Sequence, residues 1–184
     1  MEWNEEHPHW HDTYDWAGLI IQEWIGREYD PATTTILDVG AGQGKYGRLL
    51  SNFTNVDACE VWKPYVEENN LRELYREVYV CEIETLCLAG RHYDVVIMGD
   101  VLEHLTVEDA QDTLTELQED CDDIIVVVPY QYEQGPEHGN HYQRHLQADL
   151  THALMFDRYP QLRLMTVEYR SKRPFKGIYR WRSE

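Results

Sequence analysis

Residues 36–50 read ILDVGAGQGKYGRLL, and this stretch decides how the chain folds. A short apolar run from Thr35 to Val39 leads into three glycines at every second position, and a helical run follows from Lys45 to Phe53. Glycines spaced in this way allow a tight turn and a close approach of ligand to backbone. They also aim the N-terminus of the next helix at that ligand. The stretch therefore predicts a strand, a ligand-binding loop and a helix.

The loop alone leaves its ligand open. Gly42 to Gly47 also satisfies the G-x-G-x-x-G pattern of dinucleotide-binding proteins, which is a weak signal by itself. A phosphate-binding P-loop does not fit, because Val39 stands where its first glycine belongs and Tyr46 follows Lys45 in place of Ser or Thr.

Further along the chain, strand-like and helical runs alternate. This alternation predicts an α/β fold: a three-layer, doubly wound sheet of seven strands, mostly parallel, closed by an antiparallel C-terminal hairpin around the turn SKRPFK. The strands are expected at 35–39, 56–61, 78–81, 93–98, 124–128, 162–169 and 177–181, and the helices within 1–30 and at 45–53, 64–75, 106–119 and 146–159.

Acidic residues stand where three of these strands end. In a doubly wound sheet the ligand crevice lies at the carboxyl ends of the strands. Glu60 follows Gly40 by 20 residues, the place where a carboxylate accepts hydrogen bonds from ribose hydroxyls. Glu82 and Ile83 follow the third strand, where they suit the amine and the ring of an adenine, and Asp100 follows the fourth.

Taken in order, the glycine loop, Glu60, Glu82 and the stretch YDVVIMGDVLEHL resemble the class I S-adenosylmethionine-dependent methyltransferases, over about residues 36–128. The resemblance implies S-adenosylmethionine as cofactor and S-adenosylhomocysteine as product. It implies that the methionine part of the cofactor is held by Asp38, Gly40, Ala41, Gly42 and Gly44. Glu60 would bind the ribose, and Val61 or Trp62 would lie against one face of the adenine. Glu82 and Ile83 would contact the adenine, and Asp100 and Val101 would form the floor of the cofactor site.

The resemblance further implies a methyltransferase, acting on a small-molecule or peptide-like acceptor. A non-catalytic cofactor-binding or regulatory subunit with the same fold remains an alternative. We expect one domain over 1–184, with an N-terminal helical cap (1–31), a cofactor-binding core (32–130) and an acceptor-side loop, helix and hairpin (131–184). In the cap, Trp10, Tyr14, Trp16 and Trp24 form either a lid or part of the core.

Candidate acceptor-side residues lie in the loop after the fifth strand. Tyr130, Tyr132 and Glu133 are candidates for substrate contact, and His141 or His145 for a general base. His138, His141 and His145 have a spacing that permits metal ligation, but no carboxylate or thiol joins them in a fixed pattern. Histidines that form hydrogen bonds are the preferred interpretation, so no metal is expected.

The charge of the chain narrows the classes of binding partner that the sequence favours. Thirty-four acidic against 16 basic residues give a net charge of −18, which disfavours nucleic acid. The Asp/Asn-Pro-Pro-Tyr motif of nucleic-acid amino methyltransferases is also absent. Only the C-terminal segment, with Arg170, Lys172, Arg173, Lys176, Arg180 and Arg182, is basic, which suits an anionic partner or protects a sheet edge.

An acidic surface poor in lysine also suits a high-salt environment, so the cause of the acidity stays open. Cys59, Cys81, Cys87 and Cys121 form no C-x-x-C pair, which favours buried thiols in a reducing cytoplasm. No apolar run is long enough for a membrane span. Monomer and homodimer are equally compatible with the sequence.

Overall fold

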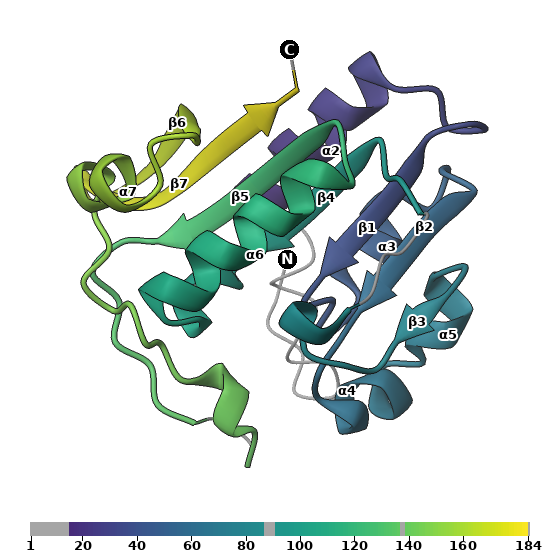
Figure 1. The fold of residues 1–184 in the computed structure, drawn as a ribbon, viewed down its shortest axis with the longest axis horizontal. Helices are drawn as coiled ribbons and strands as arrows, with labels where there is room; N and C mark the ends of the chain where they lie inside the picture. Colours follow the sequence, from purple (N-terminus) through teal and green to yellow (C-terminus); the bar gives the residue numbers. More distant parts are fainter. Residues whose placement is uncertain (1–14, 87–90, 137–138, 184) are drawn as a thin grey trace.

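The computed structural model describes residues 15–86, 91–136 and 139–183, and its centre is one seven-stranded sheet (Figure 1). The strand order is β3-β2-β1-β4-β5-β7-β6. The first five strands pair in parallel, whereas β7 is antiparallel to both of its neighbours. This confirms the α/β fold with an antiparallel C-terminal hairpin. The strands are β1 (Thr35–Val39), β2 (Asn55–Cys59), β3 (Val78–Tyr79), β4 (Val95–Gly99), β5 (Asp123–Pro129), β6 (Arg163–Arg170) and β7 (Arg173–Arg182).

Helices cover both faces of the sheet. Side chains alternate between the two faces of each central strand, so Val96 and Met98 pack into one core and Val95 and Ile97 into the other. Helices α6 and α7 cover the first face, and α2 to α5 cover the second. The described helices are α2 (Trp16–Glu28), α3 (Lys45–Leu49), α4 (Lys63–Glu68), α5 (Leu71–Leu74), α6 (Val107–Glu119) and α7 (His152–Arg158), with 3₁₀ turns η1 (Ile83–Thr85), η2 (Leu102–His104) and η3 (His141–Gln143).

Three predicted helices are shorter in the structure, and the run 45–53 is helical only over Lys45–Leu49. The run 64–75 is divided into α4 and α5 at Asn70, which adopts the left-handed conformation with φ 51°. Asparagine tolerates this conformation better than most residues. The run 146–159 becomes helical only from His152, where Thr151 is the N-cap and its hydroxyl accepts the N–H of Leu154 at 3.2 Å.

The C-terminal turn is also tighter than the sequence suggested. Ser171 and Lys172 alone form it, with φ 48° and 66°, and Arg170 pairs directly with Arg173. Positive φ at both central residues is typical of a two-residue hairpin turn that matches the twist of its strands. The prediction of a turn over 171–176 was therefore wrong, and Pro174 to Lys176 belong to β7.

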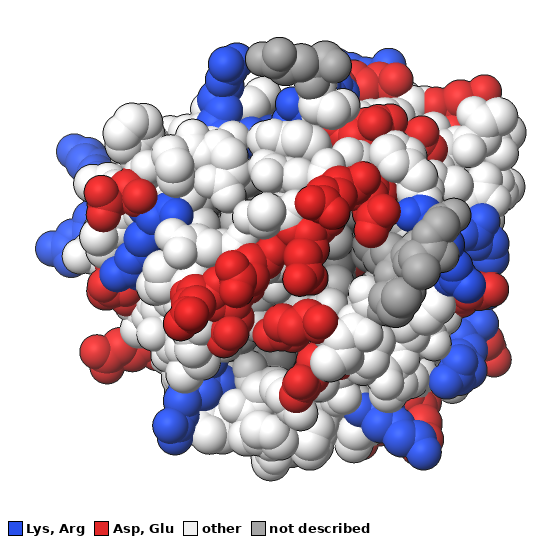
Figure 2. All heavy atoms as spheres, in the orientation of Figure 1, with Lys and Arg blue, Asp and Glu red and all other residues white. Residues whose placement is uncertain are grey.

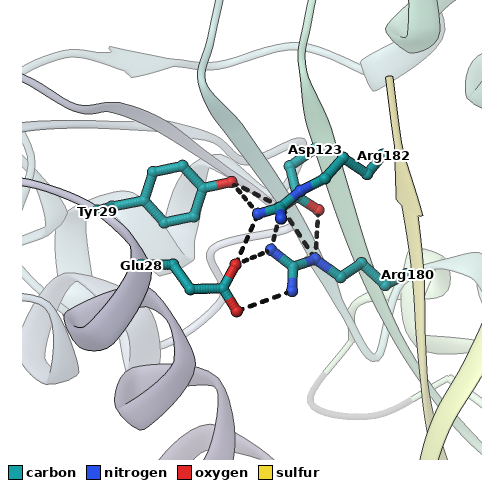
Figure 3. A network of polar contacts seen from close by, with 5 residues as sticks. All are labelled: Glu28, Tyr29, Asp123, Arg180 and Arg182. Carbon is teal, nitrogen blue, oxygen red and sulfur yellow. Dashed lines mark hydrogen bonds and ion pairs between the residues drawn. The ribbon is translucent and has the colours of Figure 1, made fainter. Parts of the chain in front are cut away.

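An ion-pair network joins the end of α2 to the last strand (Figure 3). The carboxylate of Asp123 is fully buried and accepts hydrogen bonds from Tyr29 at 2.6 Å and from Arg180 Nε at 2.9 Å. Glu28 accepts from Arg180 at 2.7 Å and from Arg182 at 2.6 Å. The bond from Arg180, aided by Arg182, lowers the pKa of Glu28 to about 2. Two arginines of the basic C-terminal segment are thus neutralised within the fold.

Helix α2 resolves the question of lid or core. Ala17, Ile21 and Ile25 are buried against the second face of the sheet, so the helix is part of the core. Only its start, at Asp15 and Trp16, reaches a cavity. The predicted contributions of Trp10 and Tyr14 lie outside the described residues. No helix in the described part of the chain is long and apolar enough to span a membrane.

Candidate active site

The glycine loop lies between the end of β1 and the start of α3. Gly40 has φ 68° and Gly42 has φ 53°, conformations that residues with a Cβ rarely adopt. A Cβ at Gly40 would also overlap the side chain of Val101. The missing side chains therefore let the loop turn beneath Val101 and present its backbone to the crevice.

Glu60 stands directly after β2, as the sequence predicted, and fixes this loop. Its side chain is only 5% exposed, and its two carboxylate oxygens accept the N–H groups of Gly42 and Trp62, both at 2.7 Å. Burial raises the pKa of Glu60, although these two hydrogen bonds oppose the rise. Since each carboxylate oxygen has a second lone pair, Glu60 can accept two further hydrogen bonds from a ligand.

A cavity of about 280 Å³ opens at the carboxyl ends of the first four strands. It brings together eight of the residues predicted to bind the cofactor, which come from the ends of β1 to β4. These are Gly40, Gly42, Glu60, Val61, Glu82, Ile83, Asp100 and Val101.

The loop before α7 covers one side of this cavity. Tyr142 donates a hydrogen bond to Glu82 at 3.1 Å, and the Tyr142 and His141 rings pack against Trp62 with centroids 6.4 and 6.0 Å away. Asn140 is 1% exposed and lines the cavity, and its Nδ2 has no hydrogen-bond partner in the described part of the chain. Asn140 can therefore donate to a ligand, a role that the sequence analysis missed.

A second cavity, of about 680 Å³, adjoins the first. Both are lined by Gly40, Gly42, Asp100, His104 and Gln143, so they meet beside the glycine loop. Among the predicted residues, Asp38, Ala41, Tyr132 and His145 line this second cavity. Trp62 and Gly44 line neither cavity.

Four charged side chains meet in the second cavity. Asp100 accepts a hydrogen bond from Lys176 at 2.8 Å and pairs with Lys45 at 3.5 Å. Asp15 pairs with the same two lysines at 3.1 and 3.6 Å. Burial opposes ionisation of Asp100, but the two ammonium groups hold its pKa below the usual value. The cluster thus presents anions and cations together, which suits a zwitterionic amino-acid group.

Asp38 is a buried acid of this cavity. It is 1% exposed, and its Oδ2 accepts a hydrogen bond from Tyr75 at 2.5 Å. Burial raises the pKa of Asp38 to about 7, although Tyr75 and Lys45 both oppose the rise. An ammonium group brought close to Asp38 would favour its ionised form.

Three predicted acceptor-side residues lie away from both cavities. Tyr130 is buried in the core, where its hydroxyl lies 2.5 Å from that of Tyr179. Glu133 is exposed, and the exposed His141 packs on Trp62. Of the two histidines considered as general bases, only His145 faces the second cavity. His138 lies outside the described residues.

The two lysines of the second cavity, Lys45 and Lys176, were not predicted, because the sequence around each of them does not indicate a binding site. In the sequence, Lys45 marked only the start of a helical run beside a P-loop mismatch, and Lys176 only part of a basic segment. Both reach the crevice because β7 lies beside β5 and α3 begins at the glycine loop. Their convergence on Asp100 depends on the sheet order, which brings together residues 76 positions apart.

Comparison with known proteins agrees with this geometry. Residues 37–119 match the family model described as a methyltransferase domain. No curated protein sequence matches the chain significantly.

Three solved structures share the fold at low sequence identity. An S-adenosylmethionine-dependent methyltransferase from Clostridium acetobutylicum is 13% identical, with a TM-score of 0.64 over 90% of this chain and 89% of that one. Magnesium protoporphyrin IX methyltransferase from Synechocystis, solved with bound S-adenosylhomocysteine, is 15% identical, with a TM-score of 0.64 over 98% and 88%. The CcbJ methyltransferase from Streptomyces caelestis is 13% identical, with a TM-score of 0.64 over 89% and 88%.

Proposed function

We propose that this chain, which carries a methyltransferase domain of the class I fold, binds S-adenosylmethionine and transfers its methyl group to a small-molecule or peptide-like acceptor. The observation that carries the proposal is the pair of adjoining cavities at the carboxyl ends of the parallel strands. The smaller cavity has an acid beyond the end of each of β2, β3 and β4 and suits a nucleoside. The larger one has the charges for an amino-acid group and room for an acceptor.

Each part of the cofactor has a suitable group in these cavities. We assign Glu60 to the ribose hydroxyls, and Glu82 with Asn140 to the adenine edge. Asp38 is assigned to the ammonium group and Lys45 to the carboxylate of the methionine part. The cofactor supplies an activated methyl group on its sulfonium. The chain has to orient the acceptor in line with the carbon–sulfur bond and to exclude water.

The surface supports a small or peptide-like acceptor over a nucleic acid. A band of acidic side chains crosses the face formed by α6 (Figure 2). It passes close to the first cavity, which is itself lined by Glu82, Glu84 and Asp109. Such a surface repels a phosphate backbone. The exposed acids of α6 are Glu108, Asp109, Asp112, Glu116 and Glu119.

We place the activity in the cytoplasm and assign the whole chain to one methyltransferase domain. A reducing compartment is supported by Cys59 and Cys81, whose sulfur atoms lie 3.8 Å apart as free thiols. A single domain is supported by the sheet, which takes strands from Thr35 to Arg182, and by the contact of α2 with its second face.

Replacing Glu60 with alanine is expected to lower the affinity for S-adenosylhomocysteine about 100-fold. Each hydrogen bond to a charged acceptor contributes about 1.5 kcal/mol or more, and two such bonds to the ribose correspond to this factor. Isothermal titration calorimetry measures the change. The matched control is Glu116→Ala on the exposed face of α6, which should keep the wild-type affinity.

An unchanged affinity in a folded Glu60→Ala protein would contradict the cofactor assignment. Because Gly42 and Trp62 also lose an acceptor, the fold of the variant must be checked by circular dichroism. Methyl transfer is then tested with radiolabelled cofactor against metabolite, peptide and nucleic-acid pools. Labelled product among small molecules or peptides supports the proposal, whereas tight binding without product in any pool favours the regulatory-subunit alternative.

A further inference from the structure

Three ligand-type side chains converge at the boundary between the two cavities. Glu103 and His104 come from η2, and His145 comes from the loop that leads to α7. One ligand atom from each lies within 4.8 Å of the other two. No role in the binding of the cofactor has been assigned to any of the three.

Glu103 is a buried acid whose carboxylate has no hydrogen-bond partner among the described residues. Its side chain is 1% exposed, and neither carboxylate oxygen has a partner within the described ranges. The nearest imidazole nitrogen, Nε2 of His145, is 3.9 Å away. A buried carboxylate without hydrogen bonds is costly unless a cation accompanies it.

In both histidines, Nδ1 contacts a backbone carbonyl, and Nε2 is the nitrogen that remains for a ligand. Nδ1 of His104 lies 3.1 Å from the carbonyl of Arg144, and Nδ1 of His145 lies 2.7 Å from that of Tyr132. A carbonyl only accepts, so each Nδ1 donates, which leaves each Nε2 available to a ligand. Metal-binding histidines are held in this way, with the second ring nitrogen bonded to a carbonyl or carboxylate.

Backbone hydrogen bonds hold the two segments together. The N–H groups of Leu146 and Gln147 donate to the carbonyl of Glu103 at 2.8 and 3.0 Å. The side-chain amide of Gln147 donates to Leu102 and Leu105 at 3.1 and 3.2 Å. The N–H of His145 donates to Gln134 at 3.0 Å. The three ligand side chains are therefore placed by a fixed frame on both sides.

We propose that Glu103, His104 and His145 bind one divalent transition-metal cation, with its remaining coordination positions open to the acceptor cavity. Two imidazoles and one carboxylate are a ligand set typical of catalytic zinc and of other first-row cations, whereas Mg²⁺ and Ca²⁺ prefer oxygen ligands. With metal–ligand bonds of about 2.1 Å, two ligands of one ion are at most about 4.2 Å apart. The ligand atoms of the observed cluster lie within 4.8 Å of one another, so side-chain rotation would have to bring them about 0.6 Å closer.

The place of this cation gives it a role that rests on the proposed function. His104 lines both cavities, so the ion would lie where cofactor and acceptor meet. A divalent cation lowers the pKa of a bound hydroxyl. The acceptor oxygen would release its proton to solvent and form a bond to the methyl carbon. The electron pair of the broken carbon–sulfur bond would return to sulfur, leaving a neutral thioether. His145 then acts as a ligand and not as the general base.

The experiment is a metal titration of the full-length, untagged protein, without cofactor. His7, His9 and His11 alternate in the sequence and can chelate a cation themselves, so all three are replaced by alanine in the starting protein. Calorimetry with Zn²⁺ and the visible absorption of bound Co²⁺ are the two measurements. We expect one ion per chain and a loss of affinity of at least about tenfold in Glu103→Gln and in His145→Ala.

The matched control is His92→Ala, because His92 is exposed and pairs with Asp122 on the surface. It should keep both the affinity and the cobalt spectrum. Glu103→Gln keeps the shape of the side chain and removes the unpaired charge, so the metal-free variant should melt no lower than its parent. Equal Zn²⁺ affinity in the parent and in His145→Ala would overturn the proposal, as would a parent that binds no ion. Because these titrations contain no S-adenosylhomocysteine, they separate a missing metal site from a wrong cofactor assignment.

Discussion

Replacing Asp38 with asparagine is expected to stabilise the protein by about 4 kcal/mol at pH 8 and by less than about 1 kcal/mol at pH 4. Asp38 is 1% exposed, and burial raises its pKa to about 7 in the folded state. The unfolded value is near 4, so the folded state resists ionisation between these two pH values. The contribution of protonated Asp38 to the free energy of unfolding is therefore fully present below about pH 4 and is lost as the pH rises through about 7.

Asparagine has nearly the same shape and can still accept the hydrogen bond from Tyr75, but it never ionises. Urea unfolding of both proteins at several pH values measures the difference. The control is Asp112→Asn, an exposed position on α6, which should show no such pH dependence. A difference of equal size at pH 4 and pH 8 would contradict the prediction. The Asp38 variant should also bind S-adenosylhomocysteine at least about tenfold more weakly, because the proposed partner of the ammonium group is lost.

Replacing Arg180 with methionine is expected to lower the free energy of unfolding by about 3 kcal/mol. The variant keeps much of the packing volume but removes a guanidinium that contacts both Asp123 and Glu28 (Figure 3). The Asp123 carboxylate is fully buried, so losing one of its cationic partners leaves a costly charge inside the protein. Chemical denaturation at neutral pH measures the loss.

The matched control is Arg27→Met, the same substitution in a surface pair with Glu23 whose side chains are 72% and 54% exposed. Such a pair contributes less than about 1 kcal/mol. In the Arg180→Met background, Asp123→Asn should recover part of the stability, because it removes the buried charge. A loss that is equal in the Arg27 and Arg180 variants, or that Asp123→Asn does not relieve, would contradict the expected role of the network.

The sequence predicted well which residues gather in the first cavity, because their positions depend on local order along the chain. Glu60 follows β2 directly and Glu82 comes three residues after β3, and parallel strands bring such residues to one edge of the sheet. Strand ends and glycine spacing are visible in sequence, so these positions could be read before any contact was known.

The acceptor side could not be predicted in the same way. Tyr130 was a candidate for substrate contact, yet it extends β5 into the core, where its hydroxyl lies over Gly177 of β7. The Glu103 cluster joins residues about 40 positions apart, and Lys176 meets Asp100 from 76 positions away. These contacts depend on which strand lies beside β5, and sequence periodicity does not carry that information.

The position of β7 has a consequence for how the protein is made. It pairs with β5 on one side and β6 on the other, and its arginines hold Glu28 from 152 to 154 positions away. During synthesis, the five parallel strands are complete while the fully buried strand β5 still has an open edge. Unpaired apolar edges of this kind template aggregation. Until residues 173–182 are made and pair with β5, this edge of the nascent chain is therefore open to pairing with other chains.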